Sequence, residues 1–511
     1  MKLFILLSTI NSQPSTFSAL FLCLILAACT PARLERLAET GRHGVVADSD
    51  LARAFDGAQD DVAKRNLGRW IEENFRKNPP PSPAGYRVRF AREGPGVYAP
   101  EYFDRLEPAS RYHVTGLKDH RVDGIGVALA GTRENHETLP VEKWYPPEGI
   151  ARAVTAVVVP GASRGGVREV EIRLLDRMRC ETLGKNQATL AADFTVPFAS
   201  VLQKAGPLQT SGFTSLLRPK ADREPGFYLM EPYDPDRTPL LLIHGLLSTP
   251  IAWAELTNDL WADPAVRRRY QIWHYLYPTN PPALYSARVM RQQLDELRKF
   301  LDPGGRDPAM RRSVVISHSM GGLLAKTLAI EPKDAFWDAI FTRPLSSLNI
   351  TPAERATLME AFYWKPRGNV DRIIFCSVPF RGSDLASSWI GRIGSALVAP
   401  SHRFEDFFRE LERKNPGLYT PEYVSLARGR ITSVTTLAPH QRSMEILDQI
   451  PLTPGTKAHI ITGSADFVVP RSSATIANAE SNIEVPAGHG SFHHPKAIAE
   501  IIRILKLPDA R

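Results

Sequence analysis

The sequence predicts an α/β protein: a doubly wound, mostly parallel sheet with helical cap insertions, preceded by a smaller β-rich domain. From about residue 224, continuous apolar strands alternate with long helical stretches. Strands of this kind are buried on both faces, as in a parallel sheet covered by helices. Upstream of residue 219, short β-like runs follow one another and are separated by Gly, Pro and Asn clusters, which is typical of a β-rich domain.

Length and composition exclude several classes of protein. The chain has 511 residues, 43% of them hydrophobic and 23% charged, so it is long enough for two or three domains and too apolar for wholesale disorder. Its net charge of +8 comes from 63 basic against 55 acidic residues, without a long basic tract carrying interleaved aromatics. Nucleic-acid binding is therefore poorly supported, and a weak attraction to anionic membrane surfaces fits the charge equally well.

The N-terminus is expected to carry a targeting signal. Lys2 precedes an apolar run over residues 19–28, which is too short to span a bilayer and ends in Leu26-Ala27-Ala28-Cys29. This ending resembles the lipobox of bacterial lipoproteins. The resemblance implies a signal peptide over residues 1–28 and a membrane anchor of three acyl chains on Cys29, and Thr30 as the next residue implies the outer membrane. An ordinary secretory signal that happens to contain Cys29 is the alternative.

The other cysteines indicate neither a disulfide framework nor a metal site. Cys23 leaves with the signal peptide, so Cys180 and Cys376 are the two that remain besides Cys29. Cys376 lies in an apolar strand pattern, and we expect it to be a small buried hydrophobe. No Cys/His cluster has the spacing of zinc ligands, so the sequence predicts no metal.

Two segments precede the α/β domain. Residues 29–85 are expected to form a helical tether that ends in a stiff, proline-rich linker at residues 78–85. Residues 86–223 form the expected β-rich domain, with strands at 87–90, 124–131, 153–159, 169–175 and 188–194. We find no set of catalytic residues in this domain. Whether it serves packing or substrate approach stays open.

The α/β domain is expected over residues 224–511. Its predicted strands are 228–233, 239–245, 272–278, 313–319, 372–379, 459–463 and 482–486. Helical insertions at about 332–370 and 384–456 leave from the carboxyl ends of strands, over the edge of the sheet where such folds place their sites. Runs at 389–398 and 404–415 are typical of amphipathic helices. The insertions have two interpretations that stay equally open. They form a lid that gates an apolar substrate, or they provide extra packing surface.

A nucleophile elbow is predicted where a strand meets a helix. Ser319 stands in Ser317-His318-Ser319-Met320-Gly321, between small residues that permit the sharp turn, although the motif usually begins with glycine where Ser317 stands. The strand at 239–245 ends in His244-Gly245, so the backbone N–H groups of Leu246 and Met320 are candidate donors of an oxyanion hole. His244 precedes the nucleophile and is expected to be structural.

The acid and the base are predicted on two later strand ends. Asp466 follows the strand at 459–463, and His489 follows the strand at 482–486. In this arrangement His489 accepts the Ser319 proton and Asp466 holds the imidazole. His489 stands between two glycines on a loop, whereas His493 and His494 immediately precede Pro495, which suits the first turn of a closing helix. We therefore expect His489 to be the base.

These motifs make residues 224–511 similar to the α/β-hydrolase superfamily, especially its lipase- and esterase-like branch with the GPI inositol-deacylase-like and triacylglycerol lipase-like proteins. The resemblance implies a cofactor-free carboxylic ester hydrolase acting on a small-molecule or lipid ester, with Arg381 as a structural anchor of its loop. The same triad serves an acyltransferase, and a non-catalytic envelope lipoprotein is a further alternative. The motifs that carry the resemblance lie at residues 243–253, 317–326, 379–383, 463–470 and 488–495.

Overall fold

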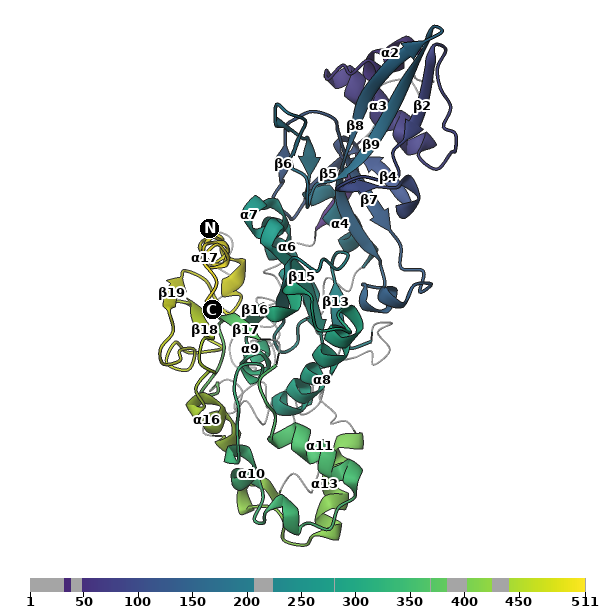
Figure 1. Ribbon diagram of the computed structural model, residues 1–511. Coiled ribbons are helices and arrows are strands. Elements are labelled where there is room, and N and C mark those ends of the chain that lie inside the picture. Colours follow the sequence, from purple (N-terminus) through teal and green to yellow (C-terminus); the bar gives the residue numbers. More distant parts are fainter. Residues whose placement is uncertain are drawn as a thin grey trace, which may run out of the picture.

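The structure is a computed structural model that describes residues 32–37, 48–205, 224–279, 281–367, 369–383, 402–424 and 441–510. The molecule is elongated (Figure 1): an N-terminal unit lies at one end, a central sheet follows, and a group of cap helices lies at the other end. Within the described ranges no helix is both long and apolar enough to cross a membrane.

The central sheet has seven strands in the order β13-β15-β14-β16-β17-β18-β19. All neighbouring pairs are parallel except β13 with β15, which are antiparallel. Each strand overlaps one of the seven predicted strands, so the predicted mostly parallel sheet is confirmed. The strands are β13 (Gly226–Leu229), β14 (Thr238–Ile243), β15 (Tyr270–Leu276), β16 (Ser313–His318), β17 (Val370–Cys376), β18 (Lys457–Gly463) and β19 (Ser481–Val485).

Helices cover both faces of this sheet because both faces are apolar. Leu241 and Ile243 of β14 point into a core shared with one pair of helices, while Leu240 and Leu242 point into the opposite core. This alternation follows from the two-residue period of a strand. The first face carries α8 (Ala283–Leu301) and α9 (Met320–Thr327), and the second carries α6 (Ala254–Ala262), α7 (Pro264–Arg269) and α17 (Pro495–Leu505).

The N-terminal unit is built on a second, mostly antiparallel sheet. Its strands run in the order β2-β9-β8-β7-β4, and β3 pairs with β9. The strands are β2 (Tyr86–Phe90), β3 (Val97–Tyr98), β4 (Arg105–Pro108), β7 (Val127–Arg133), β8 (Ile150–Arg164) and β9 (Val167–Asp176). Three short strand pairs add to it: β1 (Arg33–Arg36) with β5 (Tyr112–Thr115), β6 (Arg121–Val122) with β12 (Ala192–Asp193), and β10 (Thr182–Leu183) with β11 (Ala188–Thr189).

The predicted helices of the tether are present, but they do not stand apart from the β-rich region. Helices α2 (Asp48–Phe55) and α3 (Asp61–Asn74) pack on the sheet through a shared apolar core. Phe55 meets Trp70 edge to face with ring centroids 5.3 Å apart, and Trp70 stacks on Phe90 of β2 at 6.0 Å. The expected division between a tether and a β-rich domain thus differs from the observed arrangement, because the apolar faces of the two helices are buried on that sheet.

A buried ionic network joins the N-terminal unit to the central sheet. Arg152 of β8 pairs with Asp176 at 3.1 Å and with Glu231, which follows β13, at 3.3 Å. Arg237 also pairs with Glu231, and Glu231 as a whole is 1% exposed. Burial raises the pKa of Glu231, but the charges of Arg237 and Arg152 outweigh burial and hold this pKa below its ordinary value. Glu231 is therefore an ionised carboxylate between two arginines.

We predict that Glu231→Gln lowers the stability by about 3–5 kcal/mol, because it leaves two buried guanidinium groups without their shared carboxylate. Urea unfolding followed by tryptophan fluorescence measures the loss as a lower midpoint. The matched control is Glu169→Gln, whose exposed pair with Arg87 spans 2.9 Å and is expected to contribute about 0–1 kcal/mol. Equal midpoints for the two variants would contradict a stabilising role of the network.

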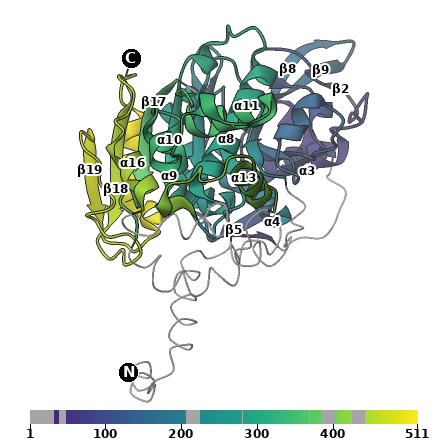
Figure 2. The same cartoon turned by 90° about the horizontal axis from the view of Figure 1, so that it is seen from below.

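The insertions form a cap at the far end of the molecule. Helices α10 (Ala335–Ile340) and α11 (Pro352–Phe362) belong to the first insertion, and α13 (His402–Lys414) and α16 (Arg442–Gln449) belong to the second. Figure 2 shows α10, α11 and α13 over α8 and α9, in agreement with their place below these helices in Figure 1. Helix α13 confirms the helix predicted at 404–415, whereas the run at 389–398 lies outside the described residues.

Candidate active site

Ser319 occupies the sharp turn between β16 and α9. Its backbone has φ 52° and ψ −130°, a conformation that a residue with a Cβ rarely adopts and that is held in place by the surrounding structure. The Ser319 N–H donates to the carbonyl of Cys376 at 3.0 Å, which ties the turn to the neighbouring strand β17. The strand-to-helix turn predicted for the elbow is therefore present.

Small residues around Ser319 let the first turn of α9 lie against the sheet. A Cβ on Gly321 would come 2.3 Å from the carbonyl oxygen of His244, and a Cβ on Gly322 would come 2.1 Å from the side chain of Val378. Ser317, where a glycine was expected, is fully buried, and its hydroxyl donates to the carbonyl of Ile374 at 3.3 Å. The turn thus accepts serine at this position because the hydroxyl has a partner on β17.

We predict that Gly322→Ala displaces the elbow and lowers any activity that depends on it, because the new methyl group overlaps Val378. The double variant Gly322→Ala/Val378→Ala makes room for that methyl and should recover a large part of the loss. Turnover and melting temperature of both variants, with Val378→Ala alone as the control, measure the effect. No recovery in the double variant would show that the overlap is not the cause.

The side chains of Ser319, His489 and Asp466 are joined in one hydrogen-bonded chain. Nε2 of His489 lies 2.9 Å from Oγ of Ser319, and Nδ1 lies 3.0 Å from Oδ2 of Asp466. They follow β16, β19 and β18 respectively, and the carboxyl ends of these parallel strands meet at one edge of the sheet. The structure therefore brings together the three residues that the sequence had placed on separate strand ends.

Asp466 is held as a carboxylate. Its Oδ1 accepts hydrogen bonds from the N–H groups of Val468 and Val469, both at 2.9 Å. Burial raises the pKa of Asp466, but the hydrogen bond and charge of His489, with the N–H of Val469 and the hydroxyl of Ser377, outweigh burial and hold this pKa below its ordinary value. An ionised Asp466 fixes the proton of His489 on Nδ1 and leaves Nε2 free to accept one.

His318, the residue before Ser319, is a part of the site that the sequence analysis missed. Its Nε2 lies 2.8 Å from the backbone carbonyl of His489, and its ring lies 4.7 Å from the rings of both His489 and Phe492. Burial, reinforced by the neighbouring His489, lowers the pKa of His318 well below its ordinary value, so its ring is neutral and Nε2 donates. His318 thus positions the loop that carries His489, and only its place inside the elbow motif pointed to it.

The residues predicted for the oxyanion hole lie beside Ser319. A Cβ on Gly245 would come 2.9 Å from the Cβ of Ser319, so the chain at Gly245 and Leu246 runs directly against the turn. Met320 is the first residue of α9, where backbone N–H groups lack a partner within the helix. Leu247, which follows Leu246, has φ 57° and donates its N–H to Oγ1 of Thr279 at 3.3 Å. This hydrogen bond fixes the loop after β14.

The residues expected to be structural make structural contacts. His244 is 1% exposed and stacks on Tyr277 with ring centroids 4.5 Å apart, and burial lowers the pKa of His244 to about 4. Arg381 anchors its loop as predicted: it donates to the carbonyls of Ser472 and Thr475, at 2.8 Å each, and pairs with Asp448 of α16 at 3.1 Å. Cys376 is fully buried in β17.

The two other histidines near His489 have partners away from Ser319. Nδ1 of His493 lies 3.0 Å from Oε2 of Glu255 on α6. Nδ1 of His494 accepts the N–H of Lys496 at 3.2 Å, which makes His494 the N-cap of α17. The predicted helix start at Pro495 is confirmed.

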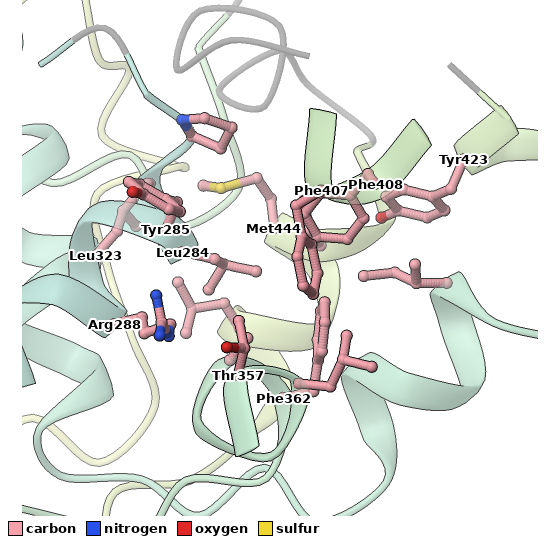
Figure 3. Close-up of a pocket in the computed structure, with 17 residues that line it drawn as sticks. Leu284, Tyr285, Arg288, Leu323, Thr357, Phe362, Phe407, Phe408, Tyr423 and Met444 are labelled. Carbon is pink, nitrogen blue, oxygen red and sulfur yellow. The ribbon is translucent and has the colours of Figure 1, made fainter. Parts of the chain in front are cut away.

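An apolar cavity of about 260 Å³ lies between helices α8 and α9 and the cap (Figure 3). The side chains that line it come from α8, α9, α10, α11, α13 and α16, with Pro282 just before α8 and Tyr423 from a short helical turn. Leu323 on α9 lines the cavity and stands four residues, or about 6 Å along the helix, from Ser319. The cavity thus offers an apolar compartment close to the turn.

Residues 240–501 match the family model described as the alpha/beta hydrolase family. Among solved structures, the chain is similar to a lipase from Bacillus licheniformis in its mature form, with 16% identity over 56% of this chain and 100% of that chain and a TM-score of 0.35. It is also similar to an esterase from Exiguobacterium antarcticum, with 14% identity over 55% and 96% of the two chains and a TM-score of 0.32. None of the curated proteins matches it.

The matched residues make up just over half of the chain and include the turn at Ser319, Asp466 and His489. They also contain five of the seven strands of the central sheet and most of β14, and leave out β13. The chain therefore belongs to the α/β-hydrolase family.

Proposed function

We propose that the protein is a serine hydrolase that cleaves carboxylic esters. The observation that carries this proposal is the unbroken hydrogen-bonded chain from Ser319 through His489 to Asp466. Such a chain makes a hydroxyl nucleophilic, because the imidazole removes its proton and the carboxylate stabilises the resulting imidazolium. In this assignment Ser319 is the nucleophile, His489 the general base and Asp466 the residue that orients the base.

The reaction proceeds through an acyl-enzyme. Oγ of Ser319 forms a bond to the ester carbonyl carbon while its proton passes to Nε2 of His489, and the carbonyl π electrons move onto oxygen. The N–H groups of Leu246 and Met320 stabilise that oxyanion, each contributing about 3 kcal/mol. The oxyanion then collapses, the C–O bond to the alcohol breaks, and the alcohol leaves with the proton from His489. Water repeats the sequence and releases the acid.

The cavity supports a substrate with an apolar acyl group. Its lining is rich in aliphatic and aromatic side chains, and it reaches the helix that Ser319 begins. At about 260 Å³ it lies just below the roughly 300–1,000 Å³ of pockets that hold drug-sized molecules, a size that suits one acyl chain of medium length. We therefore infer that the cap contributes the acyl pocket.

Labelling with a fluorophosphonate probe, which modifies activated serines, tests the function. The wild-type protein should be labelled and Ser319→Ala should not. A series of p-nitrophenyl esters of increasing chain length then separates an esterase from a lipase, and adding an alcohol as acceptor detects acyl transfer. An unlabelled wild-type protein that turns over none of these esters would contradict the proposal.

We further propose that the protein is tethered through Cys29 to the bacterial outer membrane, facing the periplasm. The support is the Leu26-Ala27-Ala28-Cys29 sequence after an apolar run that is too short to span a bilayer. A protein carrying several acyl chains stays bound to the membrane, whereas one chain holds it only marginally. Cys29 lies outside the described residues.

We predict that Cys29→Ser moves the protein from the membrane fraction to the soluble periplasmic fraction, because serine cannot receive the thioether-linked lipid. Fractionation followed by carbonate washing measures this. Cys180→Ser, which changes a cysteine of the N-terminal unit, is the matched control and should stay with the membranes. A Cys29→Ser protein that survives carbonate washing would point to an uncleaved anchor instead.

A further inference from the structure

One charged side chain lines the apolar cavity among the described residues, and it is Arg288 on α8. Figure 3 draws its guanidinium at the edge of the cavity near Leu284 and Thr357, across from Phe407 and Phe408. Over the described ranges, Arg288 forms no ion pair, and its Nε is buried without a hydrogen-bond partner. A buried guanidinium N–H without a hydrogen-bond partner costs free energy in the unliganded protein. Binding an anionic ligand that accepts this hydrogen bond would recover that cost.

The charges around Arg288 do not compensate it. Arg291, one turn further along α8, is fully buried, and its Nε and Nη1 also lack partners. The nearby carboxylates of Asp295 and Glu360 pair with Arg367, at 2.7 and 3.1 Å. Burial lowers the pKa of Arg291 to about 9; the charges of Arg367 and Arg288 also lower it, while those of Glu360 and Asp295 raise it. Three arginines thus stand against two carboxylates here. This side of the cavity therefore has an excess of positive charge.

Arg288 and Ser319 lie close enough in the fold for a single substrate to contact both. Leu323 and Arg288 line the same cavity, and α9, which Ser319 precedes, packs against α8. In the binding mode we consider, an acyl chain leaves the ester carbonyl at Ser319, passes Leu323 and occupies the apolar part of the cavity. Arg288 stands one helical turn, or about 6 Å, beyond Leu284 along α8. A group carried several carbons from the carbonyl is thus within the compartment that Arg288 borders.

We propose that this cavity selects esters whose acyl chain carries a carboxylate several carbons from the ester carbonyl, and that Arg288 is the residue that recognises this carboxylate. The inference rests on the proposed function and narrows its substrate class to half-esters of dicarboxylic acids. One guanidinium matches the single charge and planar fork of a carboxylate. A phosphate dianion would need a second unpaired cation in the lining, and the described lining has Arg288 alone.

Pairs of esters that differ only in this charge test the inference. The p-nitrophenyl half-esters of adipate and suberate are compared with the same compounds capped as methyl esters, for the wild type and Arg288→Gln. We expect the wild type to favour the anionic member of at least one pair by about tenfold in kcat/KM, as a charge-assisted hydrogen bond gives. Arg288→Gln should bring this ratio near or below one.

The matched control is Arg355→Gln, which removes the same charge from an exposed position on α11 away from the cavity and should keep the wild-type ratio. Two results would overturn the inference while leaving ester hydrolysis intact. The wild type could hydrolyse the capped esters at least as well as the half-esters, or Arg288→Gln could leave the ratio unchanged.

A binding measurement separates the inference from the proposed function. Calorimetric titration of Ser319→Ala with monomethyl suberate, with and without Arg288→Gln, needs no turnover. We expect binding that Arg288→Gln weakens by about tenfold. Binding that is absent, or equal in the two variants, would overturn the inference even if the wild type hydrolyses esters. Binding that depends on Arg288 in a protein that cleaves no ester would support the anion site and contradict the hydrolase.

Discussion

Ser319→Ala is expected to reduce ester turnover by at least about 10⁴-fold while the protein stays folded, because the attacking hydroxyl is gone and the hydrogen-bonding groups that remain give only residual catalysis. Among the described residues, the Ser319 hydroxyl has one hydrogen-bond partner, Nε2 of His489, and the turn itself is held by the backbone contact with Cys376. Turnover of a p-nitrophenyl ester and the melting temperature, measured on the same preparation, check both parts of the expectation.

Ser200→Ala is the control, since this serine lies on α4 (Thr195–Lys204) and its hydroxyl donates to the carbonyl of Pro197, far from the turn in sequence. It should keep wild-type turnover. A Ser319→Ala protein with half of the wild-type turnover and an unchanged melting temperature would show that another group is the nucleophile.

His489→Ala is expected to lose turnover to a similar degree, whereas His493→Ala and His494→Ala should keep most of it. Nε2 of His489 lies 2.9 Å from the Ser319 hydroxyl, and its removal leaves no base at that distance among the described side chains. His494 caps α17, so its loss should cost about 1 kcal/mol of stability rather than activity. His493 pairs with Glu255 on α6.

Turnover and unfolding midpoints of the three alanine variants measure this difference. The two neighbouring histidines serve as matched controls, since all three lie within six residues of one loop and helix start. A His489→Ala enzyme close to wild type beside an inactive His493→Ala or His494→Ala enzyme would overturn the assignment of the base.

The inner strands of the central sheet, such as β14 and β16, were predictable because each is a nearly continuous apolar run, and burial on both faces requires such a run whatever the neighbours are. The edge strand β19 alternates instead between more and less buried residues. The turn at Ser319 was predictable for a related reason. The residues that permit it, Ser317, Gly321 and Gly322, are adjacent in sequence, so their sizes can be read without knowing the fold.

The position of the N-terminal helices was not predictable in the same way. Their polar and apolar residues indicate helices, but the pattern does not say which surface covers the apolar side. In the structure, this surface is the sheet that contains Phe90. Trp70 stacks on Phe90, although the proline-rich linker separates the two residues in sequence. On α17, similarly, Ile504 is fully buried whereas Ile502 is half-buried, because the sheet and not the helix alone decides which face of the helix is covered.

By itself, the sequence determined the strands, the order of Ser319, Asp466 and His489, and the turn that carries the serine, because these depend on local size and apolar periodicity. The tertiary structure decided that His318 supports the carbonyl of His489 and that Glu231 joins two sheets. It also decided that Arg288 stands at a cavity with no ion-pair partner among the described residues. Glu231 and Arg152 are 79 positions apart in sequence, and His318 and His489 are 171 apart. The residues that line the cavity come from elements between residues 282 and 447. Such distances are set by how whole layers pack, and no local pattern records them.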